Sequence, residues 1–121
     1  MIALVTLLFA TTGCSSAERP DAATWLPGWQ SINAVVPDQS DLGNPPDASL
    51  CQTTLGMIRE GSEDLFPTPS GTVDELVNEW VAIAEAAFFE CPPEGEDIAS
   101  FDDAYRELRR VENSVTSALA G

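Results

Sequence analysis

Carboxyl groups are the main side chains in this sequence that could act as general acids or bases. The chain has 20 Asp and Glu residues, no His, and five basic residues that are all Arg. Without His and Lys, the Ser-His-Asp, Cys-His and Ser-Lys nucleophile arrangements cannot form, and zinc loses its commonest nitrogen ligand. We therefore expect no enzymatic activity, no metal site and no other cofactor.

Two acidic clusters, residues 94–97 and 102–103, could in principle attract Ca²⁺. They lack the alternating acidic spacing and the distal glutamate of a dedicated calcium loop, so we interpret them as a solvated acidic turn. A less favoured alternative is a carboxylate-based hydrolase. That reaction needs two acidic side chains facing each other across a cleft, about 5 to 9.5 Å apart.

One of the three cysteines, Cys14, directly follows a short apolar run. Residues 1–10 are long enough for a signal-peptide core but much shorter than the roughly 20 residues of a membrane-spanning helix. The motif Thr11-Thr12-Gly13-Cys14 resembles the lipobox of bacterial lipoproteins. The resemblance implies that residues 1–13 are a removable signal peptide and that Cys14 is acylated, anchoring the chain to the extracytoplasmic face of the cell membrane. An ordinary secretory signal is the alternative.

The net charge restricts the possible partners. The formal charge is −15 at pH 7, which repels nucleic-acid phosphates and anionic lipid alike. We therefore expect no nucleic-acid binding, membrane attachment through the acyl group alone, and a basic surface on any protein partner.

Residues 14–46 form the expected tether and lead-in segment, because they contain five prolines and no sustained periodicity. Trp25, Trp29 and the apolar residues that follow them are unusual for a disordered linker. These side chains either pack on the domain or form part of a partner-binding site.

Residues 47–121 predict three helices. Asp47 is a suitable N-cap for the first helix, which should end near Glu60 with Gly61 as a left-handed C-cap. Thr72 and Glu75 form a capping box for the second helix. Its apolar stripe continues to Cys91, and two prolines then stop the helix.

The third helix should begin after Ser100, an N-cap for an apolar stripe that extends to Leu119. We expect an antiparallel all-α bundle, in which the start of the first helix lies beside the end of the second. Cys51 and Cys91 occupy those two ends. Because Cys14 is assigned to lipid, we predict a Cys51–Cys91 disulfide.

Two further residues have an ambiguous position. Phe89 lies about 180° from Trp80 around the second helix, so the core that buries Trp80 cannot bury Phe89. Phe89 is either covered by another segment or exposed as a possible partner-binding residue. Glu112 projects into the apolar stripe near Tyr105, and we expect it to reach water at the edge of the stripe; a buried functional carboxylate is the alternative.

The expected protein is therefore a lipid-anchored, extracytoplasmic domain that binds a partner or has a structural role in the cell envelope. A phage-encoded surface lipoprotein that blocks a second phage is an alternative with the same anchor and size.

Overall fold

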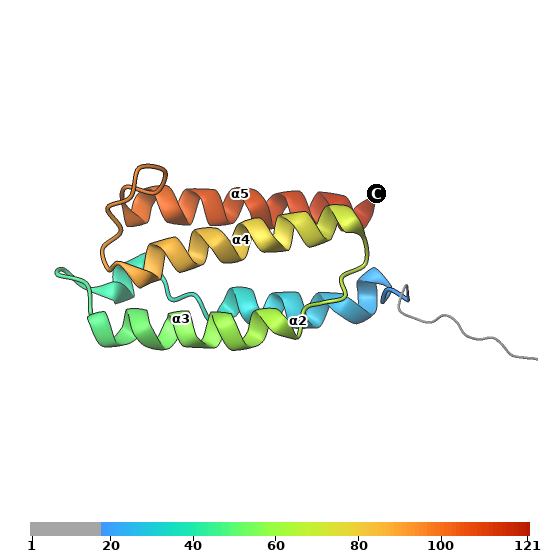
Figure 1. The fold of residues 1–121 in the computed structure, drawn as a ribbon, viewed down its shortest axis with the longest axis horizontal. Coiled ribbons are helices and arrows are strands. Elements are labelled where there is room, and N and C mark those ends of the chain that lie inside the picture. Colours follow the sequence, from blue (N-terminus) through green and yellow to red (C-terminus); the bar gives the residue numbers. More distant parts are fainter. Residues whose placement is uncertain (1–17) are drawn as a thin grey trace, which may run out of the picture.

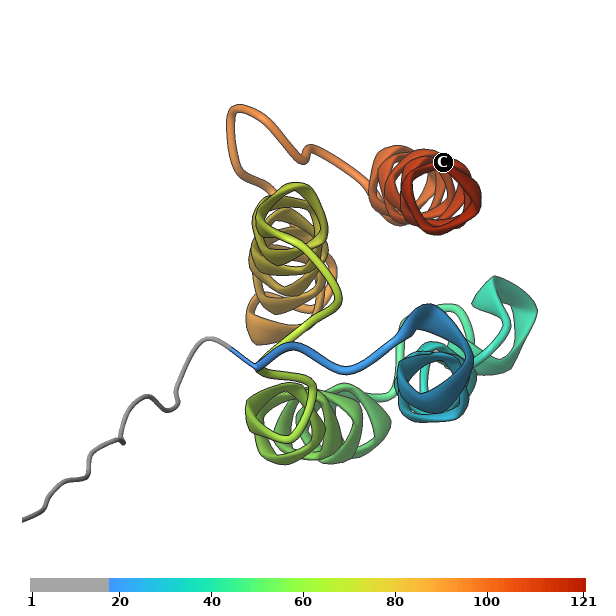
Figure 2. The same cartoon turned by 90° about the vertical axis from the view of Figure 1, so that its right-hand side faces the viewer.

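The computed structural model describes residues 18–121, which form a helical bundle without strands. The predicted signal peptide and Cys14 lie outside the described residues. The elements are α2 (Ala22–Ala34), the short 3₁₀ helix η2 (Gln39–Leu42), α3 (Ala48–Glu63), α4 (Gly71–Phe89) and α5 (Phe101–Ala120). Successive α-helices run antiparallel to one another (Figure 1). Viewed along the bundle, α2 and α3 lie on one side and α4 and α5 on the other (Figure 2).

The bundle corrects the expected helix count, because the lead-in segment contains α2. The Asp21 side chain caps this helix by accepting a hydrogen bond from the Thr24 amide at 2.8 Å. Trp25, Trp29 and Ile32 are all buried, at spacings of four and three residues. Their burial stabilises a helix that Pro27, inside it, would otherwise weaken by removing one backbone hydrogen bond.

The start of α3 agrees with the sequence, but its end does not. The Asp47 carboxylate accepts hydrogen bonds from the amides of Ser49 and Leu50 at 2.9 and 3.2 Å. Gly61 does not end the helix, which continues to Glu63. A Cβ at Gly61 would lie 3.4 Å from the Cδ1 atom of Ile32. The missing side chain therefore allows α2 to approach α3 closely.

The start of α4 differs by two residues from the prediction. The N-cap is Ser70, whose hydroxyl accepts a hydrogen bond from the Val73 amide at 3.2 Å, so Thr72 lies inside the helix. The cap of α5 is confirmed, because the Ser100 hydroxyl accepts a hydrogen bond from the Asp103 amide at 3.1 Å.

Three tryptophans occupy the centre of the core. Trp25 stacks on Trp29 with ring centroids 5.7 Å apart, and Trp29 meets the edge of Trp80 at 5.5 Å. Such pairs contribute about 0.5–1.5 kcal/mol beyond the area they bury. The indole of Trp25 also donates a hydrogen bond to the Leu65 carbonyl at 2.7 Å, which satisfies its polar atom. These contacts join α2 to the rest of the bundle.

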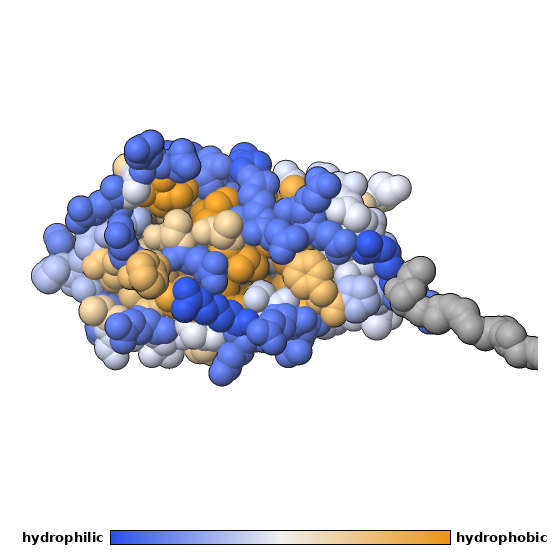
Figure 3. Space-filling model, in the orientation of Figure 1, coloured by the Kyte–Doolittle hydropathy of each residue, from blue (hydrophilic) through white to orange (hydrophobic). Residues whose placement is uncertain are grey.

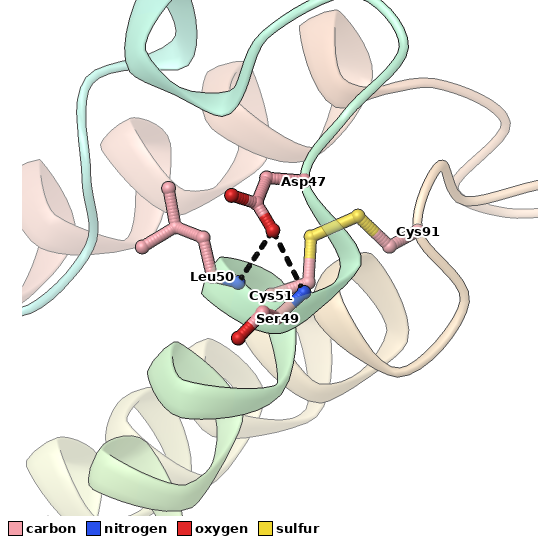
Figure 4. The surroundings of a disulfide bond; sticks show 5 residues. All are labelled: Asp47, Ser49, Leu50, Cys51 and Cys91. Atoms are coloured by element: carbon pink, nitrogen blue, oxygen red, sulfur yellow. Dashed lines mark hydrogen bonds between the residues drawn. A yellow bond between two sulfur atoms is a disulfide. The ribbon is translucent and has the colours of Figure 1, made fainter.

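The predicted disulfide is confirmed. Cys51 in the first turn of α3 is bonded to Cys91 just after α4, with Cα atoms 6.4 Å apart. Figure 4 shows the bond beside the Asp47 cap of α3. None of the helices in the described part of the chain is long and apolar enough to cross a membrane.

Candidate binding surface

An apolar ridge lies on the outer face of α4. Ala82, Ala86 and Phe89 are exposed and follow one another at spacings of four and three residues, so they share one face of the helix. Phe89 is 71% exposed, the highest exposure among the large hydrophobic residues of the described chain. In Figure 3, hydrophobic residues gather on the face formed by α3 and α4. The structure therefore favours the exposed alternative for Phe89.

A groove adjoins this ridge between α4 and α5, and we call it the α4 groove. It has a volume of about 500 Å³. Its apolar lining consists of Ala82, Ile83 and Ala86 from α4 and Ile98 from the loop that precedes α5. Ile98 is 8% exposed and belongs to the hydrophobic core, so core packing holds the side of the groove opposite α4 in position. The groove thus offers an apolar floor that continues into the Phe89 ridge.

Acidic side chains dominate the rim of the α4 groove. The lining includes four carboxylates, those of Glu79, Asp97, Asp103 and Glu107. Arg106, the one basic residue in this lining, forms an ion pair with Asp103. Because the apolar floor is bordered mainly by negative charge, the groove fits an apolar side chain flanked by basic ones.

Arg110 joins the two helices beside the groove. Its guanidinium donates to the carboxylates of Glu79 on α4 and Glu107 on α5. The hydrogen bond to Glu79, followed by that to Glu107, raises the pKa of Arg110 above its usual range. Arg110 therefore stays charged and offsets only part of the acidic rim.

The structure does not bring Trp25 and Trp29 to the same surface as Phe89. They are 6% and 3% exposed and belong to the core. Their position matches the packing alternative that the sequence left open. Of the three candidate partner-binding residues, only Phe89 is available to another molecule in the described chain.

Glu112 lies at the edge of the core. One of its carboxylate oxygens accepts a hydrogen bond from the indole nitrogen of Trp80 at 2.9 Å. The Glu112 side chain is 27% exposed, and its other oxygen is 3.9 Å from Arg109. Glu112 thus satisfies the polar atom of a fully buried tryptophan while still reaching solvent.

Tyr105 attaches the segment before η2 to α5. Its hydroxyl donates a hydrogen bond to the Pro37 carbonyl at 2.6 Å. Burial, together with the nearby carboxylates of Asp38 and Asp41, raises the pKa of Tyr105 to about 12. The phenol is therefore protonated at neutral pH and serves as a hydrogen-bond donor.

Sequence reasoning missed a polar cluster at the opposite end of the bundle from Phe89. The Arg19 guanidinium donates to both carboxylate oxygens of Asp74 at 3.2 and 3.0 Å, and to the Thr68 carbonyl at 3.0 Å. The hydroxyl of Thr68, which is fully buried, lies 2.6 Å from Asp74. Hydrogen bonds from Arg19 and then Thr68 lower the pKa of Asp74 below 3.8. No local pattern joins residues this far apart.

The described residues contain no group of three or more His, Cys, Asp or Glu side chains that could hold a metal ion. Comparison with protein-family models, with curated proteins and with solved structures finds no match for this chain. A functional proposal therefore has to be based on the structure, that is, on the α4 groove with its acidic rim and on the exposed Phe89.

Proposed function

We propose that this chain is a lipid-anchored, extracytoplasmic domain that binds a basic protein partner through the α4 groove and Phe89. Cys14 is the attachment point, by its resemblance to the lipobox cysteine. The proposal depends most on the Cys51–Cys91 disulfide. Disulfides persist in oxidising compartments outside the cytoplasm, and this pairing leaves Cys14 available for acylation.

The composition of the groove supports binding rather than catalysis. An exposed aromatic residue beside an apolar floor is typical of the central contacts in protein interfaces. The acidic rim would steer a basic partner toward the groove and help to fix its orientation. The partner should therefore present a bulky apolar side chain with Arg or Lys close to it.

The anchor can be tested in a bacterial host fed an alkyne-labelled fatty acid. We expect the full chain to carry the label and to sediment with membranes, and Cys14→Ser to lose both properties. Unlabelled, soluble wild-type protein would contradict the anchor.

The binding site can be tested by pull-down from membrane extracts, comparing Phe89→Ser with Met57→Ser. Met57 is the matched control, since it is 48% exposed but lies on α3. We expect one basic protein to be retained by the wild type and Met57→Ser, lost with Phe89→Ser, and released by salt. Equal retention by both variants would contradict the assignment of the site.

A further inference from the structure

An uncharged surface lies between α2 and the C-terminal end of α5. Residues 22–37, which include all of α2, and residues 113–121 at the end of α5 contain no charged side chain in a chain of charge −15. These two segments meet in a shallow groove of about 400 Å³ with the apolar side chains of Leu26 and Leu119 in its lining. We call this the α2–α5 patch.

The opposite end of the bundle is strongly acidic. Between residues 90 and 103 the chain has six Asp and Glu residues and no Arg. Figure 1 shows this loop, coloured orange, at the far end of the bundle from the start of α2 and the C-terminal end of α5. The acidic loop and the α2–α5 patch therefore lie at opposite ends of the bundle.

Chain length connects the α2–α5 patch to the proposed anchor. Arg19 is fixed to Asp74 in the first turn of α4, at the same end as the patch. Five residue steps separate Cys14 from Arg19, and an extended chain of that length spans at most about 18 Å. The bundle is longer than this tether, because α5, with its 20 residues, is about 30 Å long. The end of the bundle next to Arg19 must therefore stay closer to the bilayer than the opposite end can be required to.

We infer that the α2–α5 patch rests on the headgroup region of the bilayer, while the acidic loop and Phe89 face away from it. This inference depends on the proposed acylation of Cys14. Uncharged and apolar side chains enter the headgroup region at low cost, whereas the anionic surface of a bacterial membrane repels the acidic loop. The orientation leaves the α4 groove accessible to a partner.

Fluorescence quenching on vesicles tests this orientation. The acylated full chain, carrying Ser117→Cys in the last turn of α5 beside the patch or Glu94→Cys in the acidic loop, is labelled with a fluorophore. It is then bound to vesicles of phosphatidylethanolamine and phosphatidylglycerol that contain a headgroup quencher. We expect severalfold stronger quenching at position 117 than at 94, and none for either site when Cys14→Ser keeps the chain in solution.

Two exposed alanines provide a matched pair of variants. Ala120→Glu places a charge in the α2–α5 patch and should weaken quenching at position 117, whereas Ala99→Glu in the acidic loop should leave it unchanged. Equal quenching at 117 and 94 in vesicle-bound protein would overturn the orientation but not the anchor. Failure of the wild-type chain to bind vesicles would overturn both.

Discussion

Glu112 illustrates how a single carboxylate can allow a polar aromatic residue to occupy the core. Trp80 is fully buried, and its indole N–H has Glu112 as its hydrogen-bond acceptor. A buried donor that loses its acceptor forfeits the hydrogen bond and retains the cost of desolvation. This hydrogen bond gives Glu112 a structural role as the acceptor for Trp80.

Removing the Glu112 carboxylate should therefore destabilise the protein. We expect Glu112→Ala to lower the free energy of unfolding by about 1–2 kcal/mol, as measured by urea denaturation. Glu112→Gln retains an acceptor oxygen and should lose less than half as much. Equal losses for the two variants would show that the negative charge, rather than the hydrogen bond, is what matters.

Asp74 should make stability depend on pH in the acid range. Arg19 and Thr68 lower the pKa of Asp74 in the folded state. The contribution of Asp74 to the stability of the fold is therefore fully present when the pH is above the pKa that Asp74 has in the unfolded chain. That contribution is lost as the pH falls through the lowered folded pKa. We expect Asp74→Asn to reduce the stability difference between neutral and acid pH in parallel denaturation curves, whereas Glu96→Gln in the exposed loop leaves the Asp74 contribution intact.

Single residues were predictable where one local signal dominated. Asp47 and Ser100 directly precede the apolar stripes of their helices, and both caps are confirmed. At α4, Ser70 and Thr72 were both plausible caps. The contacts around the start of α4 include the ion pair between Asp74 and Arg19, which is 55 residues away in sequence. Local sequence does not contain that information.

At the scale of elements, α2 was the main structure missed. Its tryptophans and Ile32 have helical spacing, but Pro20, Pro27 and Pro37 within and beside it favoured an irregular segment. Tertiary packing of the tryptophans outweighs the cost of Pro27. The periodic α4 and α5, in contrast, were predicted with boundaries close to those observed.

Alanine substitutions at two glycines of α3 distinguish the effect of helix propensity on stability from the effect of packing between helices. Gly56 is exposed and a Cβ there would have no neighbour within 4 Å. We expect Gly56→Ala to raise the free energy of unfolding by about 0.5–1 kcal/mol. Gly61→Ala should give a smaller gain or a loss, because its Cβ would meet Ile32 at 3.4 Å. Thermal denaturation of both variants checks the difference, and equal gains would contradict the close approach of α2.

The candidate site was partly predictable at this scale. Helical geometry places Phe89 opposite Trp80, which indicated that Phe89 needed a separate environment. The other wall of the α4 groove comes from Ile98, in a loop without periodicity. Its position depends on packing against the core, so the sequence did not indicate a groove.

For the whole molecule, the Cys51–Cys91 bond should supply a large part of the stability. The two cysteines are 40 residues apart in sequence, and closing a loop of that size stabilises by about 4 kcal/mol in the chain-entropy model. The net stability of a small domain is about 5–15 kcal/mol. Cys51→Ser/Cys91→Ser should therefore unfold at a much lower urea concentration, as should the wild type treated with a reductant. A shift no larger than that of a typical surface substitution would contradict this role.

The position of the disulfide also determines how the molecule would respond to mechanical tension. A pull on the N-terminal side first loads the exposed Arg19–Asp74 ion pair and then α2, which contains a proline and contacts α3 less extensively than α4 contacts α3 or α5. Helix α2 should thus peel away first. The 40-residue separation closed by the disulfide cannot lengthen while the bond is intact, so α3 and the α4 ridge would remain a short, covalently closed unit under load.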